Sequence, residues 1–73
     1  LNMNLTLQLC KQRKSINMSQ EQLAHVIGVD TTTLQRWENN SKTPSLYNFC
    51  CWVESLGLQI KIKKKSNTKK NNL

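Results

Sequence analysis

The 73-residue sequence has few of the residues on which catalysis, metal binding and disulfide frameworks depend. It contains one histidine and four acidic residues, and no nucleophile is paired with a general base. Its three cysteines are odd in number and lack CxxC spacing, so they form neither a disulfide framework nor a zinc site. We therefore expect no enzymatic activity, no metal and no cofactor, and reduced thiols in a cytoplasm.

Long hydrophobic runs are also missing. No apolar stretch approaches the roughly 20 residues that a membrane-spanning helix needs, and no signal peptide is visible. A chain of this length buries only about 60% of its unfolded surface. We expect one small domain, without a membrane as partner, for which dimerisation would be a natural source of stability.

Negative charge is scarce, and positive charge is unevenly placed. The net charge is +7, and six of the eleven basic residues follow position 60. Residues 1–60 carry five positive and four negative side chains, or +1. A basic protein favours an anionic partner, but a nearly neutral first part means that the function has to be argued from motifs.

The first motif is a short helix over Gln20–Ile27. Ser19 is a good N-cap, and Gln22 stands three positions later, as a capping box requires. Gly28 follows at once, and glycine adopts the left-handed conformation that ends a helix. These residues predict a helix with defined ends and a tight turn after it.

A second helix is predicted over about Thr31–Asn39, with Asp30 as its cap and Asn40 closing it. Leu34 and Trp37 lie on one side and form a core stripe. Two short helices across a glycine-bearing turn are typical of a helix-turn-helix. The opposite side is polar and contains Thr32, Gln35, Arg36 and Asn39.

Residues 5–58 resemble the lambda-repressor and Cro class of helix-turn-helix proteins (XRE-like). The resemblance implies an all-α fold, a bundle of about four helices, with the DNA-binding domain over residues 1–57. A plain helical hairpin without a ligand is the alternative. The matching positions are Leu23-Ala24, Gly28-Val29, Leu34, Arg36-Trp37-Glu38-Asn39 and Pro44-Ser45-Leu46.

In this docking mode the N-terminal part of the second helix meets base edges in the major groove. Arginine suits guanine, glutamine suits adenine, and threonine suits thymine. We expect base reading by Thr31, Thr32, Gln35 and Arg36. We expect contacts to the DNA backbone from Gln20, at the N-terminus of the first helix, and from Asn39, Lys42 and Thr43.

An initial helix is predicted to run to about Ser15, with Leu5, Leu9 and Ile16 along one face. The resemblance implies that Arg13 pairs with Glu38 and ties this helix to the recognition helix. Two solvated charges, worth under about 1 kcal/mol, are the alternative.

A last helix is predicted to open at Thr43-Pro44 and to end at Gly57, because threonine caps and proline suits the first helical position. Trp52 covers the core edge or anchors an interface. The expected core face contains Leu46, Phe49, Cys50, Val53 and Leu56.

Residues 58–63 alternate apolar and polar side chains, as a half-buried strand does. One strand in a helical chain leaves unpaired backbone groups. We therefore expect it to pair with the same strand of a second copy, which gives a homodimer. The predicted dimerisation strand contains Leu58, Gln59, Ile60, Lys61, Ile62 and Lys63.

A helix-turn-helix followed by LGLQIKI resembles the HipB-type antitoxins, which implies a repressor of its own operon that binds a palindromic double-stranded operator and a HipA-like kinase toxin. The implied location of this bacterial or phage-derived protein is the cytoplasm, in association with the nucleoid. A phage repressor, a restriction-modification controller, or a toxin inhibitor with secondary DNA binding are the alternatives. Residues 64–73 are expected to be a disordered tail that attracts DNA or only aids solubility.

Overall fold

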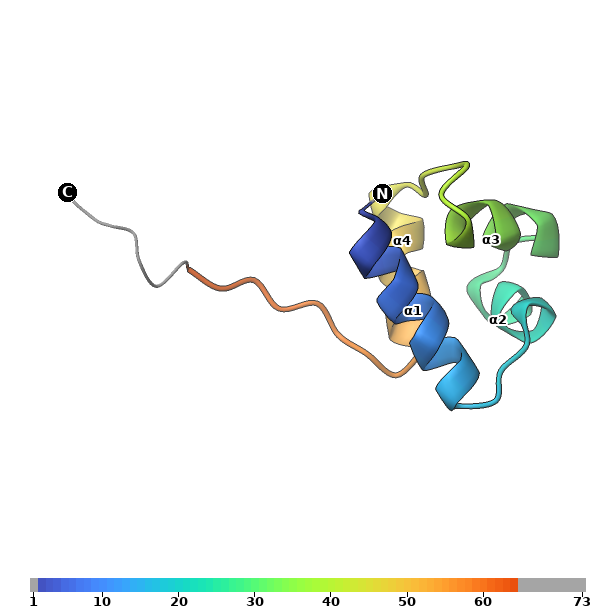
Figure 1. Ribbon diagram of the computed structural model, residues 1–73, viewed down its shortest axis with the longest axis horizontal. Coiled ribbons are helices and arrows are strands. Elements are labelled where there is room, and N and C mark those ends of the chain that lie inside the picture. The colour runs from blue at the N-terminus through green and yellow to red at the C-terminus, as the bar shows by residue number, and fades with distance from the viewer. Residues whose placement is uncertain (1, 65–73) are drawn as a thin grey trace.

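Four helices form a small bundle in the computed structural model, which describes residues 2–64 (Figure 1). They are α1 (Met3–Ser15), α2 (Gln20–Ile27), α3 (Thr31–Glu38) and α4 (Leu46–Ser55). α2 packs against both α3 and α4, and α1 packs against α3. The described residues contain no strand and no helix that is long and apolar enough to span a membrane. The helical bundle confirms the all-α part of the predicted fold class, whereas the predicted C-terminal strand is not formed among the described residues.

The core gathers apolar side chains from all four helices. Met18, Ile27, Val29 and Phe49 pack against its edge. Each helix contributes at least one residue, so burial joins the helices into a single body. The buried apolar residues are Leu9, Leu23, Ala24, Leu34, Trp37, Trp52, Val53 and Leu56.

The ends of α2 and α3 follow the predicted caps closely. Ser19 Oγ accepts from the Gln22 backbone N–H at 3.0 Å, and the Gln22 side chain accepts from the Ser19 N–H at 2.8 Å. Gly28 takes the left-handed conformation with φ 95°. Asp30 Oδ1 accepts from the Thr33 N–H at 2.8 Å. These local bonds fix the turn between the two helices.

The end of α3 differs slightly from its prediction. The helix ends at Glu38, and Asn39 is its C-cap rather than its last residue. Asn40 is left-handed, with φ 63°, as expected. Ser41 N donates to Asn39 Oδ1 at 2.9 Å and to the carbonyl of Arg36 at 2.9 Å, which turns the chain away from the helix.

The predicted start of α4 at Thr43-Pro44 is wrong. Ser45 is the N-cap, and its hydroxyl accepts from the Asn48 N–H at 3.1 Å. Both Thr43 and Ser45 can cap, so sequence alone did not separate them. Leu46 is the first residue after this cap and is 78% exposed, so its predicted place in the core is also wrong.

Trp52 lies in the centre of the core and is fully buried, which excludes the interface-anchor alternative for this side chain. Its ring centroid lies 5.5 Å from that of Trp37 and 6.3 Å from that of Phe49. Its indole N–H has no hydrogen-bond partner in the described part of the chain. The two tryptophans therefore form the bulk of the core.

Ile16 was predicted to lie on the apolar face of α1, but the structure places it outside the helix. It is the C-cap of α1 and is 45% exposed, whereas Leu9 is buried. Leaving the helical conformation at Ile16 breaks the periodicity that joined it to Leu5 and Leu9. Thr6, which apolar periodicity did not single out, is buried instead.

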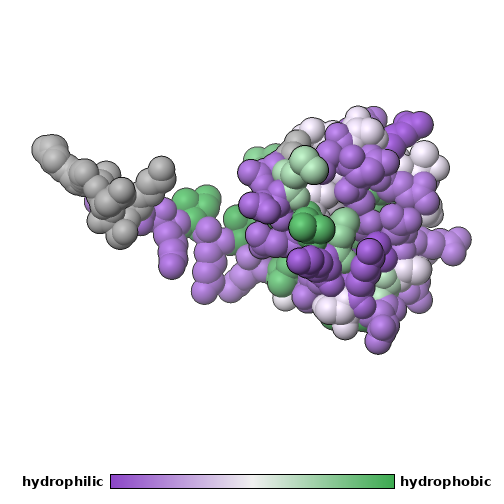
Figure 2. All heavy atoms as spheres, in the orientation of Figure 1, coloured by the Kyte–Doolittle hydropathy of each residue, from purple (hydrophilic) through white to green (hydrophobic). Residues whose placement is uncertain are grey.

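Residues 58–64 continue from α4 as an extended segment that pairs with no strand among the described residues (Figure 1). At its start the Leu58 N–H donates to the Val53 carbonyl at 3.2 Å, and residues 58–61 border a hollow between α1 and α4. Apolar and hydrophilic side chains alternate along the segment (Figure 2). Ile60 is 48% and Ile62 is 95% exposed. The single chain forms no strand here, so the intermolecular strand stays a prediction. The predicted tail, residues 64–73, lies outside the described residues from position 65 onward.

Candidate nucleic-acid interface

The outer side of α3 presents the side chains that the sequence suggests for base reading. Leu34 and Trp37 are buried on its inner side, at 0% and 2% exposure. Helical geometry then directs residues three and four positions apart outward together. Thr31 is half-buried, and Thr32, Gln35 and Arg36 are exposed.

Behind this surface, Arg13 of α1 forms an ion pair with Glu38 at the end of α3. Arg13 Nε donates to Glu38 Oε2 at 2.8 Å, and Arg13 Nη2 donates to Glu38 Oε1 at 3.1 Å. The side chains are 10% and 6% exposed. Arg13 Nη1 also donates to the Met18 carbonyl at 2.9 Å. The pair implied by the resemblance is present, and it joins α1, the α1–α2 turn and α3.

Gln20, the first residue of α2, is part of the same network. Its Nε2 donates to Glu38 Oε1 at 2.8 Å, and its Oε1 accepts from Gln35 Nε2 at 3.3 Å. The expected phosphate contact of Gln20 therefore starts from a side chain that already has two protein partners. Sequence reasoning missed these bonds because they join residues 15 and 18 positions apart.

The other expected backbone contacts lie past the end of α3. Asn39, Lys42 and Thr43 are all exposed. The side-chain oxygen of Asn39, Oδ1, accepts from the Ser41 N–H in the turn, so the side chain offers an acceptor group only the donors of its NH₂. The three residues flank the predicted base-reading side of α3 in sequence, as expected of side chains that hold phosphates.

One basic residue near this surface was not predicted. A shallow hollow of about 460 Å³ brings Lys14, Gln20 and Gln35 together. Lys14 is exposed at the end of α1. No motif or apolar periodicity in the sequence singled Lys14 out. The hollow is completed by Cys10, Arg13, Glu38 and Asn39.

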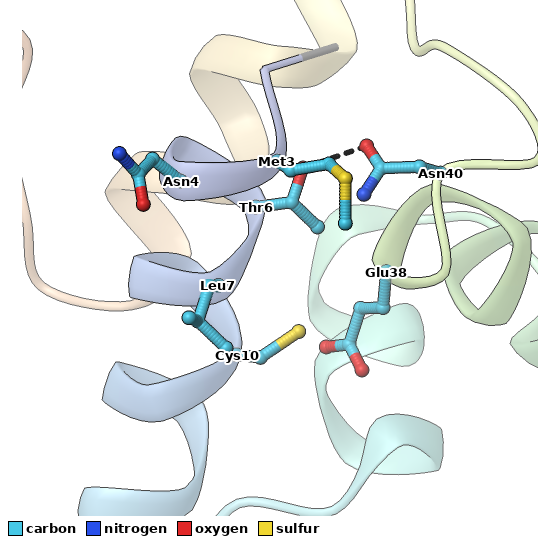
Figure 3. A pocket seen from close by; sticks show the side chains of 7 residues that line it. All are labelled: Met3, Asn4, Thr6, Leu7, Cys10, Glu38 and Asn40. Carbon is cyan, nitrogen blue, oxygen red and sulfur yellow. Dashed lines mark hydrogen bonds between the residues drawn. The ribbon is translucent and has the colours of Figure 1, made fainter.

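A second hollow, of about 290 Å³, lies between the start of α1 and the end of α3 (Figure 3). Thr6 Oγ1 lies 3.0 Å from Asn40 Oδ1 across it. Cys10 faces Glu38, and burial, followed by the nearby carboxylate, raises the pKa of the Cys10 thiol. A raised pKa keeps the thiol protonated and unreactive. The Thr6–Asn40 contact therefore joins α1 to the end of α3, and Cys10 offers no reactive nucleophile in this hollow.

Metal-binding chemistry has no support in the described residues. No group of three or more histidine, cysteine, aspartate or glutamate side chains is arranged to hold a metal ion there. What the described surface offers is a set of amide, hydroxyl and guanidinium groups along one helix. Such groups bind by hydrogen bonds and charge.

The sequence profile of the helix-turn-helix family matches residues 11–50, which span α2, α3 and the turn between them. The chain belongs to this helix-turn-helix family, of the lambda-repressor type.

The helix-turn-helix chain is also similar to a curated protein, the cryptic phage CTXphi transcriptional repressor RstR of Vibrio cholerae serotype O1. The two are 31% identical over 58 residues, which cover 80% of this chain and 52% of RstR. The chain thus spans about half the length of that relative. No solved structure matches it.

Proposed function

We propose that the protein is a sequence-specific DNA-binding transcriptional repressor that acts as a dimer on a palindromic operator. The observation that carries the proposal is the position of α3, whose inner side is locked in the core and whose outer side presents Gln35 and Arg36 to solvent. Membership of the helix-turn-helix family and the likeness to a phage transcriptional repressor support it.

In the proposed complex α3 lies in the major groove. Arg36 donates two hydrogen bonds to a guanine, the commonest specific contact, and Gln35 bonds to an adenine. Thr31 and Thr32, in the first turn of α3, offer hydroxyls and methyl groups to further base edges. Arg13 and Glu38 hold the helix at a fixed angle to α1, so these side chains approach the groove as a unit.

The phosphates on either side are held by a separate set of groups. The N-terminus of α2 favours an anion through its dipole and its first backbone N–H groups. The exposed Lys14 and Lys42 add charge. Asn39 and Thr43 add hydrogen-bonding side chains at the other end of the interface. Contacts of this kind set affinity and register but not sequence preference.

A palindromic operator requires two copies of α3. Residues 58–63 supply a natural contact, since their exposed alternation fits an antiparallel pair across a two-fold axis. Two recognition helices related in this way would read two half-sites about one helical turn apart.

The test is a titration of wild type, Arg36→Ala and Lys42→Ala against selected operator DNA and a scrambled duplex, at several salt concentrations. Arg36→Ala should cost roughly 1–3 kcal/mol per half-site on the operator and relax one base position. Lys42→Ala should weaken both duplexes about equally and reduce the salt slope by about one per contact.

The two variants separate base reading from backbone contact. If Arg36→Ala weakens both duplexes by the same factor, Arg36 touches only the backbone, and base reading passes to Thr31, Thr32 and Gln35. If wild type binds no duplex better than the scrambled one, the proposed function is wrong.

A HipB-like antitoxin that represses its own operon and binds a HipA-like kinase is a second candidate. The extended alternating segment at residues 58–63 is the feature that favours it. Co-purification of the protein with the product of a neighbouring kinase-like gene would support the antitoxin role. An isolated gene within a prophage would favour the phage-repressor role instead.

A further inference from the structure

In the hydrogen-bond network behind α3, Glu38 determines which group donates and which accepts in each bond. An ionised carboxylate accepts hydrogen bonds and donates none. Glu38 Oε2 accepts from Arg13 Nε at 2.8 Å, and Glu38 Oε1 accepts from Arg13 Nη2 at 3.1 Å. Both carboxylate oxygens already accept from the Arg13 guanidinium, so Glu38 offers only acceptors to its third partner, Gln20.

This fixes which way the Gln20 amide faces. Only its NH₂ group can bond to Glu38, and the two atoms lie 2.8 Å apart. The carbonyl end of the same amide must then face the other way. There it accepts from Gln35 Nε2 at 3.3 Å. An amide that could otherwise bond in either orientation is therefore held in one.

The orientation passes on to Gln35, which is exposed on the outer side of α3. Because Gln20 presents a carbonyl oxygen, Gln35 turns its NH₂ group toward it. One N–H of Gln35 is used in that bond. Its second N–H and its Oε1 remain for a ligand, as one donor beside one acceptor.

We propose that Glu38 and Gln20 are positioning residues that set the base preference of Gln35, although neither reads a base itself. The inference rests on the proposed DNA-binding function. A donor beside an acceptor matches adenine, whose N7 accepts and whose N6 donates. The reversed amide would turn both N–H groups outward and would suit guanine, whose N7 and O6 both accept. The hydrogen bonds from Glu38 through Gln20 to Gln35, which we call the relay, therefore select adenine over guanine at the position that Gln35 reads.

The experiment selects binding sites from a random duplex pool and then measures affinity for the four bases at each operator position. It compares wild type with Gln35→Ala, Gln20→Met and the double variant. Methionine has about the length of glutamine but lacks the amide, so Gln20→Met leaves the Arg13–Glu38 pair in place. The matched control is Gln8→Met, an exposed glutamine of α1 outside this network.

Gln35→Ala should identify the position by abolishing its adenine preference, a discrimination of roughly 5- to 150-fold for a bidentate contact. Gln20→Met should lower the adenine-to-guanine ratio at that same position by about fivefold, the worth of one hydrogen bond. The double variant should resemble Gln35→Ala alone, because the two residues act in series. Gln8→Met should leave every ratio unchanged.

A uniform loss of affinity in Gln20→Met, with the adenine-to-guanine ratio intact, would overturn the relay. In that case Gln20 merely contacts a phosphate, and the proposed function survives. A preference for guanine at the Gln35 position in wild type would also overturn it. If the pool yields no preferred sequence, the proposed function fails. The hydrogen bonds of the relay are then tested in the protein without DNA.

Side-chain amide NMR provides that second measurement. The Gln35 NH₂ group should be more ordered in wild type than in Gln20→Met, and Gln8→Met should match wild type. Glu38→Gln, which keeps an acceptor but adds a donor, should also loosen Gln35, provided that its melting curve shows a folded protein. Equal order of the Gln35 amide in wild type and Gln20→Met would overturn the relay.

Discussion

The helix-turn-helix unit, residues 19–40, and the segment at residues 58–64 both carry regular sequence patterns, yet only the unit buries its apolar pattern within the chain. In the unit, the capping side chains of Ser19 and Asp30 each bond within three residues, and the apolar stripe of α3 is buried. In the segment, Ile60 and Ile62 remain exposed.

This contrast arises because an amphipathic helix and a strand need different partners. A helix satisfies its own backbone groups, so an amphipathic helix needs a partner only for its apolar face. A strand needs a partner for its backbone as well. The helices of the unit therefore form in a single chain, whereas the segment needs a second chain or another protein before its pattern becomes structure.

The largest expected effect is at the ion pair that joins α1 to Glu38 of the unit. Arg13→Met removes the guanidinium from a carboxylate that is only 6% exposed. Leaving one partner of a buried pair uncompensated costs about 3–5 kcal/mol of unfolding free energy. Urea denaturation followed by circular dichroism measures this loss.

The matched control is Lys11→Met, an exposed lysine on the same helix. It should change stability by less than about 0.5 kcal/mol. Arg13→Lys, which keeps the charge but loses the bidentate geometry, should fall between the two variants. Equal stability of Arg13→Met and Lys11→Met would mean that the pair contributes nothing.

The features of the unit that sequence predicted are the local ones. Ser19 with Gln22, Gly28 and Asp30 each act on neighbours three or four residues away, so spacing alone identified them. The start of α4 was predicted wrongly, because Thr43 and Ser45 are both competent caps and the proline after Thr43 favoured the first of them. In the structure Ser45 is the cap, and its hydroxyl accepts from the Asn48 N–H.

Long-range polar contacts were the larger omission. Thr6 meets Asn40 across 34 positions, and Gln20 meets Glu38 across 18. Periodicity cannot reveal such pairs, since it reports only which face of an element is apolar. The Arg13–Glu38 pair was anticipated only through the family resemblance. The outer face of α3 was predictable, but the groups that orient its side chains were not.

The next effect compares two apolar residues. Leu34→Ala in the core of the unit should destabilise the protein by about 2–5 kcal/mol, because it opens a cavity at a fully buried site. Ile62→Ala in the segment should change the stability of the monomer by less than about 0.5 kcal/mol, because Ile62 is 95% exposed. A large loss in dilute Ile62→Ala would show that the segment is folded within one chain.

The segment itself is tested by Ile60→Pro. Proline cannot donate to a strand ladder, so the variant should be monomeric at micromolar concentration if residues 58–63 pair between two copies. Its monomer stability should match that of wild type. Ile60→Val keeps both the N–H and the β-branched shape and should stay dimeric. Sedimentation velocity measures all three proteins, and a dimeric Ile60→Pro would contradict the strand model.

The smallest expected effect concerns the cap of α3. Hydrogen bonds from Thr33, by its side chain first and its backbone second, hold the pKa of the Asp30 carboxyl below its ordinary value of 3.8. A group with a lowered folded-state pKa stabilises the protein above its unfolded pKa, and this contribution is lost as the pH falls through the folded-state pKa. Asp30→Asn keeps a capping side chain but cannot titrate in this range.

The stability difference between wild type and Asp30→Asn should therefore be constant from neutral pH down to about pH 4 and should shrink below it. Urea titrations between pH 6 and pH 3 measure this difference, and carbon-detected NMR of the Asp30 carboxyl measures its pKa directly. The same pH dependence should persist in an Ile62→Ala background, because the segment makes no contribution to the cap. A difference that stays constant below pH 4 would mean that ionisation of Asp30 does not strengthen the cap, and that hydrogen-bonding geometry alone holds the start of α3.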